Sequence, residues 1–483
     1  MEFEGVIGLE IHVQLKTKTK MFCRCKVVDI NSPANSSICP ICVGHPGVLP
    51  LPNKEAIKMI IKIGHALNMK INSFSVFARK NYFYPDLPKG YQISQYELPL
   101  CENGFIDING QKIRIKRAHL EEDAAKSLHA IGSQKLDYTL IDFNRCGVPL
   151  VEIVSEPDIR TPDQAYEYLI KLKKILRWID VSNCDMEKGE LRCDVNISIR
   201  EKGSNIFGTK VEIKNLNSFK AVKDALNYEI ERQIYLKTKN EPIISETRLW
   251  DQVKRQTFTM RIKETATDYR YFPDPDLLPI VIEQETIDEI KRNLGKLYDE
   301  IKQNYISKYM LKEEEIETIV SNRYLSLYFE KVIKDTNDKN IVKNAINIIN
   351  TQVLYYINQN KIDETEYLEK LPNPDYIYDI AKMLSENIIS ASAAKKIFEE
   401  MIKTGESPLV LVDKLNLRQT NDITEIENII KEAININKKA FDDFKNGNDK
   451  ASGPIVGYVM KQTKGKANPK MIIEILRKLT INN

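Results

Sequence analysis

The stretch KIRIKRAHLEEDAAK (residues 112–126) carries the pattern around which the rest of this chain is organised. Its first half alternates apolar and cationic side chains, which predicts a β-strand with one wet face. Three consecutive acids, Glu121, Glu122 and Asp123, follow after three intervening residues. Carboxylates at the end of a basic strand are suited to hold a divalent cation beside a phosphate. A solvated, charge-balanced turn would show the same residues, so this stretch alone does not decide the function.

The stretch VIGLEIHVQL (residues 6–15) also alternates, so Glu10 and His12 share one face of a predicted strand and apolar residues share the other. Three further strands are predicted at residues 150–154, 192–200 and 210–214. The polar residues of the four strands are Glu10, His12, Glu152, Asp194, Asn196, Ser198, Lys210, Glu212 and Lys214. One such strand is an ordinary sheet with a wet face, but four in one region favour a polar cradle that binds a ligand.

Four cysteines form two close pairs, Cys23 with Cys25 and Cys39 with Cys42, and thirteen residues separate the pairs. Two such pairs across a turn-rich loop match a tetrahedral zinc site. Four thiolates leave no open coordination position, so the predicted zinc is structural. The alternative is a set of unligated thiols. The remaining cysteines occur singly and show no nucleophile motif: Cys101, Cys146, Cys184 and Cys193.

Aromatic residues, cations and prolines interleave in RKNYFYPDLPKGYQISQY (residues 79–96). Extended backbone with exposed rings would offer stacking platforms for unpaired bases. Tyrosines buried in a loop-rich core would give the same pattern, and the sequence leaves both interpretations open.

Helix start signals are clear at three places. Residues 53–67 show helical spacing of apolar side chains, Thr161 precedes a proline and an acid, and Ser218 precedes a further helical pattern. Near residue 290 the alternating strands give way to Lys-, Glu- and Asn-rich helical periodicity. We therefore expect an α+β fold in three parts: an antiparallel-sheet cradle domain (1–292) with a zinc-binding insertion (23–42), an all-helical arm (293–405) and a small helical tail domain (406–483).

The charge balance is nearly even, with 71 Lys and Arg against 68 Asp and Glu among 483 residues, so any nucleic-acid surface must be local. No stretch approaches 18 consecutive apolar residues, and the first residues lack the features of a signal peptide. We expect a cytoplasmic protein that does not enter a membrane. The eight cysteines are too few for a disulfide scaffold in a chain of this length.

Seven motifs together resemble the B subunit of the tRNA-dependent amidotransferase family, nearly from end to end. They are GLEIHV (8–13), RKNYFYPD (79–86), HLEED (119–123), VSEPDIR (154–160), KVEIKNLNSF (210–219), DYRYFP (268–273) and GKANP (465–469). Their length and irregularity make chance agreement negligible. Two positions depart from the family pattern, Ala78 where Asp is usual and Ala125 where Gly is usual; neither is a proposed ligand.

The resemblance implies a cradle that binds Mg²⁺ and ATP and phosphorylates the side-chain carboxylate of a misacylated tRNA. The matching magnesium-site positions, also expected to be catalytic, are Glu10, His12, Glu122 and Asp194, with Glu121 and Glu152 as weaker candidates. Because imidazole is an unusual magnesium ligand, His12 is also a candidate for a second cation or for orienting a water. Three lysines are candidates for neutralising the phosphates: Lys80, Lys210 and Lys214.

No cysteine or serine lies in a glutaminase motif, so the ammonia must come from elsewhere. The resemblance implies an amidase subunit that supplies it, with a small third subunit that braces the heterotrimer. It also implies that the tail grips the tRNA body through a basic cluster around Gly465, Asn468 and Pro469. That cluster consists of Lys461, Lys464, Lys466, Lys470, Arg477 and Lys478.

The expected function is ATP-dependent conversion of Glu-tRNA(Gln) to Gln-tRNA(Gln), of Asp-tRNA(Asn) to Asn-tRNA(Asn), or of both, with glutamine as amido donor. One alternative is a non-catalytic tRNA-binding zinc adaptor, and another is a stand-alone ATP-dependent ligase for a small acid. The acidic face of the predicted sheet argues against a pure RNA binder, because carboxylates repel phosphates.

Overall fold

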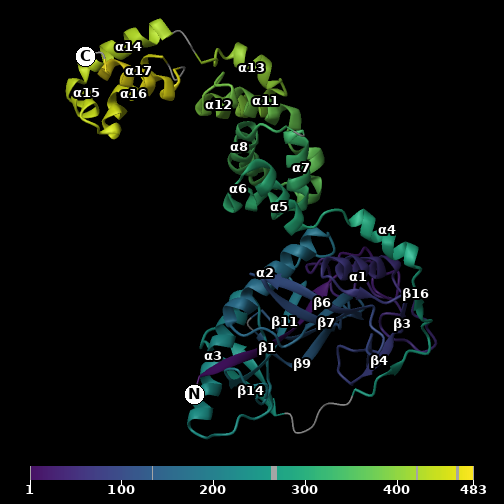
Figure 1. Cartoon of the computed structure of the whole chain (residues 1–483). Coiled ribbons are helices and arrows are strands. Elements are labelled where there is room, and N and C mark those ends of the chain that lie inside the picture. The colour runs from purple at the N-terminus through teal and green to yellow at the C-terminus, as the bar shows by residue number, and fades with distance from the viewer. Residues whose placement is uncertain are drawn as a thin grey trace. The chain divides into compact units, whose positions relative to one another are not determined.

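The computed structural model contains two compact units, Met1–Leu297 and Tyr298–Asn483 (Figure 1). The first mixes helices and strands around a large, mostly antiparallel sheet, and in its described part the second is helical. The α+β fold with a helical C-terminal region is therefore confirmed in outline. The finer boundaries near residues 292 and 405 stay predictions. The structure describes residues 2–132, 134–262, 269–334, 336–419, 423–463 and 467–481.

The central sheet has nine strands in the order β14-β13-β12-β11-β1-β10-β7-β6-β2. All neighbouring strands are antiparallel except β12 and β13. Their bounds are β1 Phe3–Gln14, β2 Lys70–Ile71, β6 Cys101–Ile108, β7 Gln111–Glu122, β10 Pro149–Ser155, β11 Leu191–Glu201, β12 Val211–Lys214, β13 Glu246–Asp251 and β14 Gln256–Ile262.

Helices cover the apolar face of this sheet. Leu9 and Ile11 of β1 are fully buried, and Gly5 on the same face lies so close to α3 that a Cβ would meet Ile230 Cδ1 at 3.3 Å. The predicted helix starts are confirmed, because Thr161 Oγ1 accepts the Gln164 N–H at the start of α2 and Ser218 caps α3 in the same way. The helices of this unit are α1 Lys54–Ala66, α2 Pro162–Trp178, α3 Phe219–Thr238 and α4 Gln284–Leu294.

The register of the sheet collects polar side chains on its other face. His12 of β1 pairs with Glu152 of β10, which in turn pairs with His119 of β7. On the other side of β1, Glu10 pairs with Asp194 of β11. Directly paired residues of antiparallel strands point to the same face, so these five side chains share one surface.

Smaller sheets flank the central one. The sheet β15-β4-β5 lies against β7 through β5, and β8 forms a hairpin with β9. The bounds are β3 Phe74–Ser75, β4 Ala78–Asn81, β5 Tyr91–Ser94, β8 Lys126–Ile131, β9 Gln134–Asp142, β15 Phe272–Pro273 and β16 Ile280–Val281.

The second unit begins with helices of about three turns. Its first group is α5 Tyr298–Tyr309, α6 Glu313–Val320, α7 Arg323–Ile333, α8 Lys339–Ile348, a π-helical turn Ile349–Val353, α9 Leu354–Asn360, a 3₁₀ turn Glu364–Glu366, α10 Tyr367–Lys370, α11 Pro374–Ser385, α12 Ala391–Thr404 and α13 Pro408–Lys414. The last helices are α14 Ile423–Ile436, α15 Lys438–Lys445, a 3₁₀ turn Asp449–Ser452, α16 Gly453–Gln462 and α17 Pro469–Ile481. These last helices share a core of their own around Ile430, Ile455 and Ile472.

Among the described helices, none combines the length and the apolar character needed to span a bilayer.

Candidate functional site

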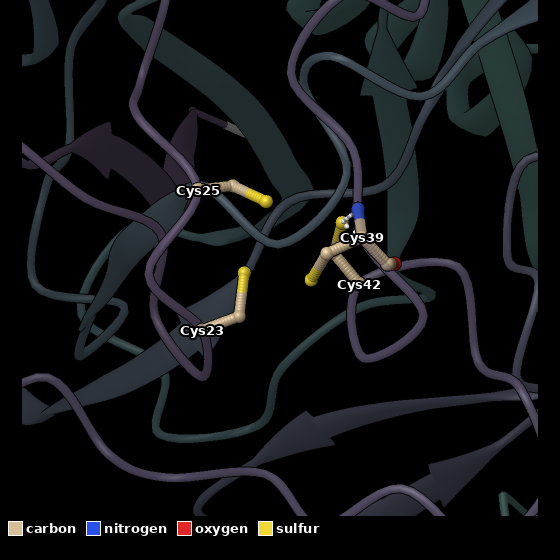
Figure 2. Close-up of side chains that lie close together, drawn as sticks. All are labelled: Cys23, Cys25, Cys39 and Cys42. Atoms are coloured by element: carbon tan, nitrogen blue, oxygen red, sulfur yellow. Dashed lines mark hydrogen bonds between the residues drawn. The ribbon is translucent and has the colours of Figure 1, made fainter.

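The four cysteines of the predicted zinc site come together after β1. Their Sγ atoms all lie within 4.8 Å of one another, and the side chains point toward a common centre (Figure 2). The Cys39 N–H donates a hydrogen bond to Cys42 Sγ at 3.2 Å. Four sulfurs at this spacing, with a backbone donor on one of them, fit a tetrahedral Zn²⁺.

Hydrogen bonds and a nearby ammonium group favour the thiolate form of Cys42. A hydrogen bond from the Cys23 thiol is the main reason that the pKa of Cys42 is lowered to about 4, and the Cys39 N–H and Lys20 add to it. Lys20 is fully buried, and its Nζ lies 3.6 Å from Cys42 Sγ and 3.1 Å from the Phe143 carbonyl oxygen. A buried ammonium beside a sulfur offsets the negative charge that four thiolates would concentrate there.

A second cluster of metal-ligating side chains lies on the polar face of the sheet. One ligand atom each from His12, Glu121 and Glu152 lies within 4.8 Å of the others. His12 Nε2 is 3.7 Å from Glu121 Oε2 and 3.9 Å from Glu152 Oε2. Two carboxylates and one imidazole around a common point form a set that accepts a divalent cation.

His119 lies directly against this cluster. Its Nε2 is 3.1 Å from Glu152 Oε2 and 3.3 Å from Glu121 Oε1, and the side chain is almost fully buried. Burial alone would lower the pKa of His119, but the two carboxylates, Glu152 first, raise it to about 9.

Glu121 is buried among donors and cations. Its Oε1 accepts a hydrogen bond from Ser94 Oγ at 2.7 Å, and Gln92 Nε2 lies 3.4 Å from Oε2. Burial would raise the pKa of Glu121, but attraction to Lys80 and His119 holds it well below its usual range. Burial would likewise lower the pKa of Lys80, and the attraction of Glu121 leaves it raised. The carboxylate therefore stays ionised despite its burial.

A further group of acids lies beside this cluster on the same face. The Lys214 ammonium pairs with Asp194 and, at 3.1 Å, with Glu212 Oε1. Asn196 Nδ2 donates to Glu10 Oε1 at 2.8 Å. Glu10 and Asp194 thus lie on adjacent strands, each held by a neighbouring donor.

Glu122 lies apart from both groups. Consecutive residues of a strand point to opposite faces, so Glu122 faces away from Glu121. Its Oε1 pairs with the Lys89 ammonium and accepts the Ile93 N–H at 3.1 Å. It lines a cavity of about 200 Å³ that also borders Cys42. That Glu122 ligates magnesium stays a prediction.

The three candidate lysines lie in different surroundings. Lys80 on β4 is half-buried over the Tyr269 ring, 5.1 Å from its centroid. Lys214 is half-buried in its ion pairs, whereas Lys210 is exposed just before β12. The structure therefore brings Lys80 and Lys214 to the polar face and leaves Lys210 in solvent.

Part of the aromatic stretch (residues 79–96) packs against other rings, and part of it is exposed, so each of the two interpretations holds for some of its residues. The Tyr96 and Tyr271 rings stack at 4.1 Å, and Tyr82 packs edge-on against Tyr269. Phe83 is 83% exposed, and its ring is open to solvent. The stretch thus supplies an aromatic wall beside Lys80 and an exposed tip.

Sequence reasoning did not single out His119 or Glu212 as site residues. His119 lies beyond the alternating residues 112–117, and a register shift between β7 and β10 at this point reverses the faces, so the alternation does not reveal its orientation. Its contact with Glu152 depends on the register between β7 and β10, which the sequence does not reveal.

The basic cluster of the tail is only partly described. Lys461 lies at the end of α16, and Lys470, Arg477 and Lys478 lie on α17. Arg477 approaches Asp449 at 3.3 Å. Lys464, Gly465 and Lys466 lie outside the described residues, as does Asp268 of the DYRYFP motif.

Comparison with known families decides the class of protein. Residues 5–288 match the family model of the GatB/GatE catalytic domain, and residues 327–479 match the model of the GatB domain. The chain belongs to the GatB/GatE family. The predicted resemblance is confirmed, and with it the assignment as a catalytic subunit of the amidotransferase class of ligases.

Full-length relatives support this family assignment. The B subunit of the aspartyl/glutamyl-tRNA(Asn/Gln) amidotransferase of Persephonella marina is 48% identical over 485 residues, covering 99% of this chain and 100% of the relative. Proteins of the same name from Caldanaerobacter subterraneus and Thermotoga maritima are each 46% identical, over 482 and 484 residues, and both alignments cover 99% of each chain. The similarity thus extends through the helical unit as well as the GatB/GatE catalytic domain.

Proposed function

We propose that this chain converts Glu-tRNA(Gln) to Gln-tRNA(Gln), Asp-tRNA(Asn) to Asn-tRNA(Asn), or both, as the B subunit of a glutamine-dependent amidotransferase. The observation that carries the proposal is the His12, Glu121 and Glu152 cluster on the polar face of the sheet. A family member that bound tRNA without chemistry would gain nothing from buried, ionised carboxylates at this place.

The reaction has two steps. A carboxylate resists ammonia because it is anionic and its oxygen is a poor leaving group. The side-chain carboxylate of the aminoacyl-tRNA first takes the γ-phosphoryl group of ATP, which gives an acyl phosphate and ADP. Ammonia then adds to the acyl carbon and loses a proton, and inorganic phosphate leaves with the C–O bond that breaks.

We propose that His12, Glu121 and Glu152 hold one Mg²⁺ and that Glu10 and Asp194 hold a second cation or its waters. When bound, Mg²⁺ would supply positive charge to the phosphoryl oxygens. Lys80, attracted by Glu121, contributes a fixed cation from the protein itself, and Lys214 is placed to exchange its carboxylate partners for a phosphate. Lys210 is exposed at the surface, so it could contact only a phosphate that extends out to it.

We propose a structural Zn²⁺ on the four cysteines, with no part of its own in this chemistry. Their spacing and the Cys39 donor support it. The zinc insertion would then order a loop that buries little apolar surface.

A groove beside the cluster fits the acceptor end of the tRNA. It has a volume of about 440 Å³ and begins at Gln14, two residues beyond His12 on the same strand face. Its lining includes four cations and apolar residues of the cysteine loop such as Ile30, together with three acids: Lys16, Lys126, Arg145 and Lys188 against Asp29, Asp142 and Glu190. Cations beside apolar surface suit the phosphate and base of a terminal nucleotide.

Replacing Lys126 and Lys188 together with Met is expected to raise the KM for aminoacyl-tRNA about tenfold, with kcat nearly unchanged, because two phosphate contacts are lost. Steady-state kinetics over a range of tRNA concentrations and salt would measure it. Lys58 of α1, which is half-buried and lies outside the groove, is the control when replaced by Met. An unchanged KM in the double variant would contradict the groove.

We propose that the complex, in the cytoplasm, also contains an amidase subunit, a small third subunit that completes a heterotrimer, and the misacylated tRNA. The relatives are named as subunits, which supports an assembly of several chains. The basic residues of α16 and α17 support a role of the tail in holding the tRNA body.

The test of the proposed function uses the full chain co-purified with its amidase partner. With Mg²⁺, ATP and ammonium, we expect ADP and amidated aminoacyl-tRNA to form in equal amounts and only when Glu-tRNA(Gln) or Asp-tRNA(Asn) is present. Tight tRNA binding without either product would favour the zinc adaptor. Turnover of free glutamate or aspartate without tRNA would favour the stand-alone ligase.

A further inference from the structure

We propose that His119 is a positioning residue that holds Glu152 and Glu121 in the geometry required to bind the divalent cation, without touching the cation itself. The inference rests on the proposed function, because it takes His12, Glu121 and Glu152 as the ligand set. The geometry that carries it is one ring nitrogen, Nε2, within 3.3 Å of both carboxylates.

The strand register explains why one ring reaches both acids. His119 is the direct partner of Glu152 across β7 and β10, and Glu121 is the next residue on the same face of β7. An Nε2–H in this position donates to whichever carboxylate oxygen is turned away from the cation. Ligating carboxylates are commonly oriented by such outer hydrogen bonds.

The two carboxylates depend on His119 to different degrees. Glu121 also accepts hydrogen bonds from Ser94 Oγ at 2.7 Å and from Gln92 Nε2 at 3.4 Å. Within the described part of the chain, the ion pairs of Glu152 are with His119 at 3.1 Å and His12 at 3.9 Å. His12 belongs to the ligand set, so it cannot orient Glu152 once it binds a cation. Glu152 therefore relies on His119.

The other nitrogen of the ring argues against a merely structural role. His119 Nδ1 is buried and has no hydrogen-bond partner among the residues that the structure describes. A buried polar atom without a partner lowers stability, so an apolar side chain of similar size would pack at least as well here. The ring is thus explained by what its Nε2 does for the two carboxylates.

The test compares His119→Gln with His119→Leu in the full chain, purified with its amidase partner. A glutamine amide nitrogen can take the place of Nε2, whereas leucine fills the space without a donor. We expect His119→Leu to weaken Mn²⁺ binding, measured by electron paramagnetic resonance titration, by roughly 10- to 100-fold, and His119→Gln by no more than about threefold. The activity of His119→Leu should recover largely at high Mg²⁺.

The exposed His129 of β8, replaced by Gln, is the matched control and should bind Mn²⁺ as the unaltered protein does. Equal loss in His119→Gln and His119→Leu, or normal affinity in His119→Leu, would overturn the proposal. Loss of a ¹⁴N coupling to Mn²⁺ in His119→Gln would also overturn it, because His119 would then be a ligand.

Failure of the underlying site is recognisable separately. If His12→Ala and Glu152→Gln leave Mn²⁺ affinity unchanged, the cation binds elsewhere, and the proposed ligand set is wrong whatever His119 does. If both weaken binding while His119→Leu does not, only the positioning role is wrong.

Discussion

Glu121→Gln is expected to reduce kcat for amidated tRNA by roughly 10²- to 10³-fold, the range seen when a group that stabilises a transition state is removed. Glutamine keeps the shape of the side chain and its hydrogen bond from Ser94, so the sheet should fold normally. It removes the charge that His12 and Lys80 face, and with it one proposed ligand. ADP formation and amidated tRNA should fall together, since both depend on the first step.

The matched comparison for Glu121→Gln is Glu122→Gln. The sequence favoured Glu122 as the stronger ligand, whereas the structure pairs it with Lys89 on the opposite face. If Glu121 is the ligand, Mg²⁺ dependence should shift in Glu121→Gln and stay normal in Glu122→Gln. The reverse result would restore Glu122 and displace Glu121.

Two measurements guard against a trivial loss of activity. The affinity for tRNA, measured by filter binding, should change little in either variant, because neither carboxylate lines the proposed groove. The exposed Glu55 of α1, replaced by Gln, should retain full activity.

Much of the fold could be predicted because the strands are amphipathic. Alternation in residues 6–15 identified β1 and its two faces, and the helices that cover the apolar face were marked by Thr161 and Ser218. These signals are local: each depends on the spacing of side chains within one element and on a capping hydroxyl.

The site was harder to predict because it depends on which side chains of different strands lie next to each other. Glu121 and Glu122 are adjacent in the sequence, and only the pleat of β7 decides which one meets His12. Likewise, the pairing of His119 with Glu152 follows from register, and the burial of Lys80 follows from the packing of a separate small sheet. No pattern within one strand contains this information.

Removing the proposed zinc is expected to lower the stability of the first unit without unfolding its central sheet. The cysteine loop is largely exposed, so little apolar burial would hold it once Cys42 is replaced by Ser. A loss of about 3 kcal/mol, far below the roughly 10–16 kcal/mol that zinc gives isolated finger peptides, corresponds to a fall in Tm of roughly 5–10 °C. Metal analysis should find about one zinc per chain before the change and none after it.

The effect of zinc loss should reach the acidic strand end through the backbone. The Met21 N–H donates to the Gly147 carbonyl at 2.6 Å, and the Gly147 N–H donates to the Asp123 carbonyl at 2.8 Å. Cys146 Sγ also contacts the Cys42 carbonyl at 3.1 Å. Limited proteolysis of Cys42→Ser should therefore cut first within the loop and then near Gly147, before any cut in the sheet.

Cys184→Ser is the matched control for the zinc experiment, since Cys184 is buried and single, outside the four-thiol cluster. We expect it to lower stability through packing alone and to keep both the zinc and the protease resistance of residues 23–42. If Cys42→Ser retained its metal and its resistance, the loop would be ordered by Lys20 and its buried contacts alone. We do not expect this outcome, because Lys20 is buried and charged. Without metal-bound thiolates, its ammonium group would have too few anions nearby to offset the cost of burial.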